Sequence, residues 1–238
     1  MQKQANAQAN SWPDYFAQRA RQCRDPQLQQ FYAVGLPAPE TPLRDVPFMA
    51  LDFETTGMNA HRHAIVSIGM VPFSLASIRP AAGHYWVVRP AGAMSGRSVG
   101  IHHITHAEVA TAPDLDEVLG EVLAALAGKI AVVHYRHIER PFLDAEVMAR
   151  RGEPCQFPLV DTMAIEAYWT RQGLLARLKR LFGLNHSPIR LAESRERYGL
   201  PHYTSHHAKV DALATAELFL AQVARYYSPD TPISELWL

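Results

Sequence analysis

The chain has 238 residues, of which 48% are hydrophobic, enough for one well-buried core and a small appendage. It contains 23 basic and 23 acidic residues, so no global positive field steers it to polyanions, and nucleic-acid binding would need a local patch or metal ions. Its two cysteines exclude a disulfide framework. Because no apolar run has the length of a membrane span and the N-terminus has no signal core, we expect a cytoplasmic protein without membrane contact.

Residues 1–45 are predicted to form an N-terminal extension. Residues 1–11 are polar and Gln-rich, which predicts disorder. Residues 12–36 carry spaced aromatic and arginine side chains around Pro26, which predicts two short helices before a Pro-rich linker. We expect that this extension could contact a protein partner.

The pattern changes at Phe48 to short apolar runs bounded by turn residues. The first three runs, 48–53, 64–73 and 84–90, have short connections and predict an antiparallel meander. Strand patterns then alternate with helix patterns, in the order helix 113–128, strand 130–135, helix 139–152, strand into helix 157–164 and helix 209–227. The sequence therefore predicts an α/β fold with a mixed five-stranded sheet, a meander followed by parallel strands, flanked by helices.

Two carboxylates stand one residue apart at the end of the first predicted strand, in the run PFMALDFETTG. Side chains alternate along a strand, so Asp52 and Glu54 point to the same face. Like charges held side by side raise one another's pKa, and a divalent cation is their usual stabiliser. The pair predicts a metal site, although a solvent-exposed strand end with two independent carboxylates would give the same tripeptide.

A third carboxylate follows the strand predicted at 130–135. In VVHYRHIERPFL, His134 ends the strand and Glu139 opens the next helix, which places Glu139 at the carboxyl edge of the sheet, where sites in such folds gather. A helix N-terminus also favours acidic residues, and Arg136 or Arg140 could pair with Glu139. The position therefore fits either a site residue or local stabilisation of the helix.

Two further candidates come from HHAKVDALATA. Asp211 lies within an otherwise apolar helical pattern, so it is either a buried carboxylate that needs a partner or a solvent-facing residue. His206, five residues earlier, is predicted to lie in a loop from which it could act as a general base.

Taken together, these residues resemble the DEDDh branch of 3'→5' exonucleases over residues 46–226. DFETTG matches the first family motif, and His206, Ala208, Asp211 and Ala212 match the third. SVGIHHITHAEV, residues 98–109, is similar to the family segment around IHGIT. The resemblance implies a ribonuclease H-like exonuclease domain over 46–226 and a C-terminal tail over 227–238.

The second motif departs from the family pattern V-A-H-N-x-x-F-D-x-x-F-L. His134 matches, but Tyr135 replaces Asn, Ile138 replaces Phe and Glu139 replaces Asp. The extra methylene shifts the carboxylate, and magnesium demands near-ideal geometry. Glu139 could bind through water, bind directly after a backbone adjustment or favour manganese; Asp144 is a fallback ligand.

The resemblance implies a two-metal-ion 3'→5' exonuclease that releases nucleoside 5'-monophosphates from single-stranded DNA or RNA. Two Mg²⁺ or Mn²⁺ ions would be held by the four carboxylates, while His206 takes the proton from the attacking water. The implied substrate-binding residues are Thr55, Thr56, Gly57, Met58 and His134. Ordinary turn chemistry is the alternative for the Thr-Thr-Gly segment.

Other expectations concern partners and charge. Related exonucleases are often dimers, so the resemblance implies a homodimer. Five basic residues are the candidates for following the phosphate backbone: Arg177, Lys179, Arg180, Arg195 and Arg197. Asp161 is interpreted as a helix cap or an outer partner of the metals. The alternative to an enzyme is a degenerate, non-catalytic module that binds nucleic-acid ends or a protein.

Overall fold

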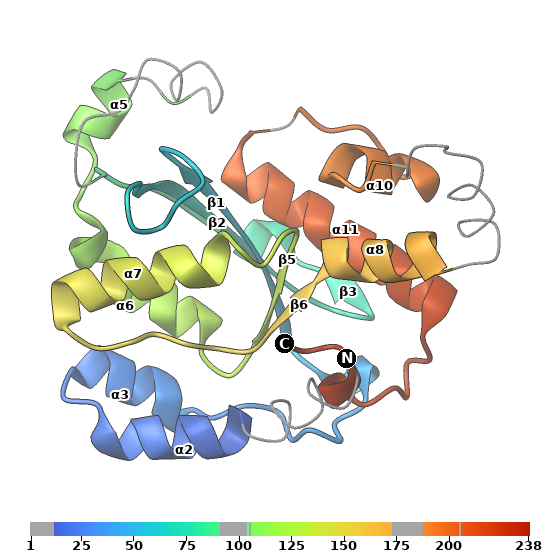
Figure 1. The fold of residues 1–238 in the computed structure, drawn as a ribbon, viewed down its shortest axis with the longest axis horizontal. Coiled ribbons are helices and arrows are strands. Elements are labelled where there is room, and N and C mark those ends of the chain that lie inside the picture. The colour runs from blue at the N-terminus through green and yellow to red at the C-terminus, as the bar shows by residue number, and fades with distance from the viewer. Residues whose placement is uncertain (1–11, 91–103, 105, 173–187, 205) are drawn as a thin grey trace.

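The structure is a computed structural model that describes residues 12–90, 104, 106–172, 188–204 and 206–238. A six-stranded mixed sheet forms its centre, in the order β3-β2-β1-β5-β6 with β4 also pairing with β2, and helices flank the sheet (Figure 1). The strands are β1 (Phe48–Thr55), β2 (Ile65–Ser74), β3 (Ser77–Ile78), β4 (His84–Val87), β5 (Ile130–Val133) and β6 (Leu159–Asp161).

The α-helices alternate with the later strands, as the sequence pattern predicts. They are α2 (Trp12–Gln22), α3 (Pro26–Ala33), α5 (His106–Thr111), α6 (Leu115–Leu126), α7 (Glu139–Arg151), α8 (Thr162–Gln172), α10 (Leu191–Arg197) and α11 (Ala208–Tyr226). Short 3-10 helices are η1 (Leu43–Asp45), η2 (Pro80–Ala82) and η3 (Ile233–Glu235). Within the described ranges, no helix is long and apolar enough to cross a lipid bilayer.

The sheet is antiparallel in its first part and parallel in its second, which confirms the predicted α/β class. β1 pairs with β2 in antiparallel register, and both β1 with β5 and β5 with β6 run parallel. The predicted number of five strands was wrong by one. The two-residue strand β3 pairs with Phe73 and Ser74 and is too short to produce a periodic pattern.

Alternation along β1 distributes its apolar side chains between two clusters. Met49, Leu51 and Phe53 pack in the cluster that also holds buried residues of α6 and α7. Phe48 and Ala50 pack in the cluster that contains residues of α11. A strand covered on both faces in this way is rigid, which matters because β1 ends in the two carboxylates.

The N-terminal helices belong to the first of these clusters. The predicted pair of short helices is confirmed, and the buried side chains of Phe16, Phe31 and Tyr32 lie in the same cluster as the sheet. The Glu153 carboxylate accepts hydrogen bonds from the backbone N–H groups of Arg24 and Asp25, each at 2.9 Å. These aromatic side chains are therefore used inside the molecule, and a partner would have to contact the outer faces of α2 and α3.

The C-terminal residues also pack on the core. The backbone N–H of Leu238 donates to the Leu159 carbonyl at 2.8 Å, and Trp237 is buried. The N–H of Leu43 donates to the Thr231 carbonyl at 2.9 Å. The domain limits at 45/46 and 226/227 remain predictions, and the disorder expected for residues 1–11 lies outside the described residues.

Candidate metal centre

Three of the four predicted carboxylates come together at the end of β1. Asp52 and Glu54 lie opposite Gly69 and Ser67 of β2, and Asp211 comes from the first turn of α11. One carboxylate oxygen from each of the three residues lies within 4.8 Å of the others. The same-face prediction for Asp52 and Glu54 is thus consistent with the geometry, and Asp211 joins them from a distant part of the chain.

Gly69 allows the start of α11 to lie this close to the sheet. A Cβ atom at this position would lie 2.1 Å from the carbonyl carbon of Ala208 and 2.2 Å from the backbone nitrogen of Lys209. Backbone atoms cannot move aside as a flexible side chain can, so only glycine permits this contact. Because Gly69 is the register partner of Asp52, the contact places Asp211 beside the strand carboxylates.

Burial and mutual repulsion raise the pKa values of two carboxylates of this cluster. Burial raises the pKa of Asp52 well above its usual range, and the negative charges of Glu54, Glu139 and Asp211 raise it further. Burial also raises the pKa of Asp211, while the backbone N–H of His206 opposes this increase. Clustered carboxylates with raised pKa values gain most from a bound cation.

Glu139 lies beside these three residues rather than among them. Its side chain is 2% exposed, and its Oε2 atom is buried without a hydrogen-bond partner among the described residues. Burial raises its pKa to about 8, with a further contribution from the charge of Asp161. A buried carboxylate oxygen without a donor is costly unless a cation compensates it, so Glu139 fits a metal. The fallback residue, Asp144, instead accepts a hydrogen bond from the Cys155 N–H at 2.8 Å.

His206 lies at the exposed side of the cluster. Its φ of 73° places it in the left-handed region, and its backbone N–H donates to Asp211 Oδ2 at 2.7 Å. This bond fixes the orientation of one carboxylate and holds the loop against the start of α11. The side chain of His206 is exposed, as a group that exchanges protons with solvent requires.

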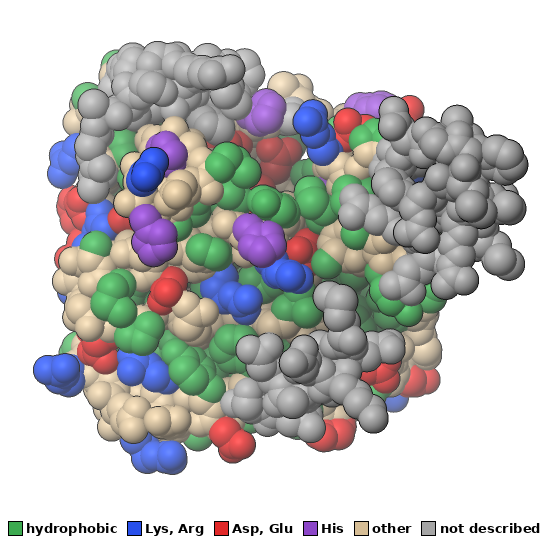
Figure 2. Space-filling model, viewed as in Figure 1, with side chains coloured by type: hydrophobic (Ala, Val, Ile, Leu, Met, Phe, Trp, Pro, Cys, Tyr) green, Lys and Arg blue, Asp and Glu red, His purple; other side chains and the backbone are tan. Residues whose placement is uncertain are grey.

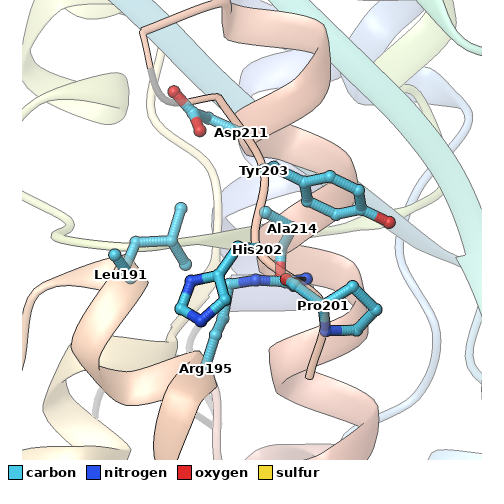
Figure 3. Close-up of a pocket in the computed structure, with 8 residues that line it drawn as sticks. Leu191, Arg195, Pro201, His202, Tyr203, Asp211 and Ala214 are labelled. Carbon is cyan, nitrogen blue, oxygen red and sulfur yellow. Dashed lines mark hydrogen bonds between the residues drawn. The ribbon is translucent and has the colours of Figure 1, made fainter. Parts of the chain in front are cut away.

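Hydrogen bonds from a buried arginine stabilise the segment that precedes His206. Arg195 of α10 donates to the carbonyl oxygens of Ala214 at 2.6 Å and Pro201 at 2.8 Å, and its guanidinium pairs with Glu217 at 2.7 Å. Figure 3 shows Arg195 between the Pro201 segment and the helix that carries Asp211 and Ala214. This role could not be predicted from the sequence, because charge on a short helix gives no sign of burial.

Two of the basic residues expected to follow the phosphate backbone, Arg195 and Arg197, are among the described residues. Arg195 is committed to the contacts above, and Arg197 pairs with the buried carboxylate of Glu166 at 2.7 Å. The interpretation is therefore wrong for Arg195, which is buried and bound by internal acceptors. Arg197 is exposed, and its contact with the phosphate backbone stays a prediction. Arg177, Lys179 and Arg180 lie outside the described residues.

The turn after Glu54 is held by hydrogen bonds within the protein, and its last residue is exposed. Thr55 Oγ1 donates to the Gly57 carbonyl at 2.8 Å, and Thr56 Oγ1 accepts from the Ala64 N–H at 3.0 Å. A Cβ at Gly57 would lie 2.6 Å from the His63 ring. Met58 is 69% exposed. Ordinary turn chemistry therefore accounts for the shape of this segment, and it leaves Met58 available to a ligand.

The ring of His134 is hydrogen-bonded within the protein. Its Nδ1 lies 2.8 Å from Thr162 Oγ1, and its Nε2 lies 3.0 Å from the Ile189 carbonyl. Burial lowers the pKa of His134 to about 4, so the ring is neutral at physiological pH. The predicted contact of His134 with substrate stays a prediction.

Asp161 has a larger role than a helix cap. Its carboxylate accepts from the N–H groups of Met163 and Ala164 at the start of α8, at 2.9 and 3.2 Å. It also accepts from the N–H groups of Tyr135 and Arg136, each at 3.2 Å. The cap was foreseeable from its place between strand and helix, but the bonds to the turn before Glu139 were not.

The completed arrangement is a recess of oxygen ligands at one edge of the sheet. Figure 2 shows acidic side chains in a hollow on this face, with histidine and basic side chains near its border. Carboxylate oxygens are the ligands that Mg²⁺ and Mn²⁺ prefer. The donor set and the unpaired oxygen of Glu139 therefore fit divalent cations.

Comparison with known proteins agrees with this chemistry. The chain is 28% identical over 181 residues to the DNA polymerase III subunit epsilon of Treponema pallidum, covering 76% of this chain and 78% of that one. It is 29% identical over 176 residues to the PolC-type DNA polymerase III of Thermotoga maritima, covering 74% of this chain but only 12% of that one.

A solved structure shows the same fold. The nuclease domain of 3'hExo, a DEDDh family member bound to rAMP, superposes with a TM-score of 0.59 at 16% identity, covering 76% of this chain and 92% of that one. A family model described as an exonuclease matches residues 49–219, which include all four carboxylates and His206. The chain therefore belongs to the DnaQ-like exonuclease family and is a nuclease.

Proposed function

We propose that this nuclease removes nucleotides from the 3' end of single-stranded DNA or RNA with two divalent cations, Mg²⁺ or Mn²⁺, and releases nucleoside 5'-monophosphates. The observation that supports this most directly is the trio of carboxylate oxygens within 4.8 Å, with the buried unpaired oxygen of Glu139 beside it. Buried carboxylates with raised pKa values must either take up protons or bind a cation, and a divalent cation compensates several of them at once.

The roles of the residues follow from their chemistry. Asp52, Glu54, Glu139 and Asp211 would hold the cations, which supply an activated water and charge stabilisation at the departing 3' oxygen. His206 would take the proton from the attacking water, since its side chain is exposed next to Asp211. Asp211 is oriented for this by the N–H of His206.

The terminal nucleotide would lie against the turn that follows β1. Thr55, Thr56 and Gly57 form this turn, and the exposed Met58 offers an apolar surface to a base. His134, directly after β5, would contact the nucleotide from the other side, and its ring is hydrogen-bonded to Thr162. The nuclease domain of 3'hExo was solved with rAMP bound, and a nucleotide of that kind suits the carboxylate edge of this sheet.

Partners and location are proposed from the relatives. The similarity to a DNA polymerase III subunit supports a polymerase as a protein partner and a cytoplasmic location. The outer faces of α2 and α3 are available for such a contact, because the aromatic side chains of these helices are turned inward.

The test is a time course with 5'-labelled single-stranded DNA and RNA in magnesium or manganese. We expect a ladder that shortens from the 3' end, loss of cleavage in Asp52→Asn, and full activity in the matched control Asp45→Asn, which changes a surface carboxylate. Metal should also raise the melting temperature of the wild type but not of Asp52→Asn. Absence of cleavage on every strand with both metals would overturn the proposal and favour a non-catalytic binding module.

A further inference from the structure

Two non-glycine residues in the described part of the chain have a positive φ, and both border the metal centre. They are His206, at 73°, and Tyr135, at 103°. A side chain with a Cβ rarely adopts this conformation, and such strain persists only where the surroundings enforce it. The proposed function uses His206 as the base, so Tyr135 is the strained residue that still lacks a role.

Register places Tyr135 at the level of the carboxylates. β5 runs parallel to β1 with Val132 opposite Ala50, and it ends at Val133, so His134 leaves the strand at about the level of Asp52. Tyr135 follows directly, and Glu139 begins α7 four residues later. In Figure 1 the turn between β5 and α7 lies at the edge of the sheet where α11 begins.

Hydrogen bonds to Asp161 hold Tyr135 in this strained conformation. This buried carboxylate accepts the N–H groups of Tyr135 and Arg136, each at 3.2 Å, while it also caps α8. The Tyr135 carbonyl accepts the N–H of Ile138 at 3.2 Å, which closes the turn. Three backbone hydrogen bonds therefore hold Tyr135 where it is, against its own conformational preference.

The side chain that this turn presents is not part of the core. Tyr135 is 36% exposed, and its ring contacts the ring of His137 at 5.1 Å between centroids with a 57° angle between planes. A core position would have offset the strain with buried apolar area, but this position leaves an aromatic face open to solvent. Met58, in the turn after β1, is another exposed apolar side chain.

We propose that Tyr135 is a base-stacking residue that binds one nucleobase of the strand being degraded. This inference rests on the proposed nuclease function. Aromatic rings stack on any base, so the contact would add affinity without sequence preference. It suits a chain whose basic and acidic residues are equal in number, because such a protein gains little from long-range attraction to phosphates. The Tyr135–His137 pair would act as one wall for the base.

The experiment measures the affinity of a short labelled strand with hydrolysis-resistant phosphorothioate links by fluorescence anisotropy, in magnesium or manganese. We expect Tyr135→Ala to weaken binding by about 5-fold to 100-fold, the loss of one stacking contact. The matched control Tyr135→Phe keeps the ring and should bind within about twofold of the wild type. Tyr135→Gly removes the ring and the strain together, so it should fold well and bind as weakly as Tyr135→Ala.

An abasic scan tests the contact from the side of the nucleic acid. Removing the base at a single position, moved stepwise from the 3' end, should weaken wild-type binding most at one position, and that loss should vanish in Tyr135→Ala. Equal binding by the wild type and Tyr135→Ala, or an abasic penalty of the same size in both, would overturn the inference. If the abasic result holds while no strand is cleaved, the stacking contact stands and the proposed hydrolysis fails.

Discussion

Glu139 is one methylene longer than the Asp of the family pattern, and we expect this difference to affect metal preference. The family pattern has Asp at this position, and the longer Glu139 side chain is buried with one oxygen unpaired. We expect Glu139→Gln to lower kcat at least tenfold and to reduce metal-induced stabilisation, because an amide cannot supply a charged ligand oxygen. Glu139→Asp should raise the ratio of activity in magnesium to activity in manganese, since the shorter side chain suits the stricter geometry.

These results are read from steady-state rates and melting temperatures in each metal. Asp144→Glu provides the control, because Asp144 lies on the same helix and binds the Cys155 N–H instead of the cluster. Wild-type activity in Glu139→Gln with both metals would show that three carboxylates suffice.

His134 links stability to pH. Its folded pKa of about 4 lies below its usual value, because charging the ring in its buried site is unfavourable. As pH falls below about 6.5, His134 takes up a proton in the unfolded chain but stays neutral in the folded one. The neutral, hydrogen-bonded ring therefore stabilises the fold above pH 6.5, and this stabilisation is lost as pH falls toward 4. Full protonation would lower the free energy of unfolding by about 3 kcal/mol.

The check is denaturant unfolding of the wild type and His134→Gln between these pH values. The difference in free energy of unfolding between the two proteins should shrink as pH falls, whereas His61→Gln, at an exposed position, should follow the wild type. A constant difference across the range would contradict the assignment.

The residues that could be predicted share a local signal. Asp52 and Glu54 face the same way because strands alternate, and Asp211 stood out as an acid in an apolar helical pattern. The bonds of Asp161 to the turn and the backbone of Tyr135 could not be predicted in the same way. These hydrogen bonds join residues 25 and 26 positions apart, and tyrosine carries no preference for positive φ.

At the scale of elements, the docking of α11 on the sheet assembles the cluster. Gly69→Ala would place a methyl group 2.1 Å from the backbone of Ala208, so the start of α11 must move. We expect a loss of about 1–3 kcal/mol of stability and a loss of metal-induced stabilisation, because Asp211 moves with the helix.

Metal titrations followed by thermal melting would test this. Gly120→Ala is the matched control: its new methyl group meets the flexible Gln27 side chain, and alanine favours the helix. Normal metal response in Gly69→Ala would mean that α11 reaches the cluster without this contact.

The secondary-structure elements that the sequence did not predict are too short to show a hydrophobic period. Strand β3 has two residues, and α10 has seven with no side-chain cap at its start. Periodicity cannot identify either one, because a pattern needs several turns or residue pairs to emerge. Their existence depends on partners far along the chain, such as Arg195 of α10 with Ala214. The long elements that carry the carboxylates, β1 and α11, were predictable to within a few residues.

At the scale of the whole molecule, the N-terminal helices and the nuclease fold share a core. Phe16 is buried in the same cluster as residues of β1 and α6. Phe16→Ala should therefore cost about 3–5 kcal/mol and lower the melting temperature of the entire molecule in one transition.

Calorimetry with the exposed control Gln18→Ala would show this. A separate early transition for the N-terminal part, with the rest melting at the wild-type temperature, would show instead that these helices are a dispensable addition. The sequence predicted these helices only as an appendage. Aromatic and arginine residues on short helices do not reveal which part of the protein they pack against.

The three carboxylates within 4.8 Å also have a consequence for the order of binding. Under the proposed function, the carboxylates alone would repel a polyanion, and bound cations would attract one. Cation and strand would then be reciprocal effectors, because the factor by which the ions raise affinity for the strand equals the factor by which the strand raises affinity for the ions. The apparent metal requirement of the enzyme should consequently fall as substrate becomes abundant, so that free nuclease at low metal stays idle and hydrolysis begins where strand ends accumulate.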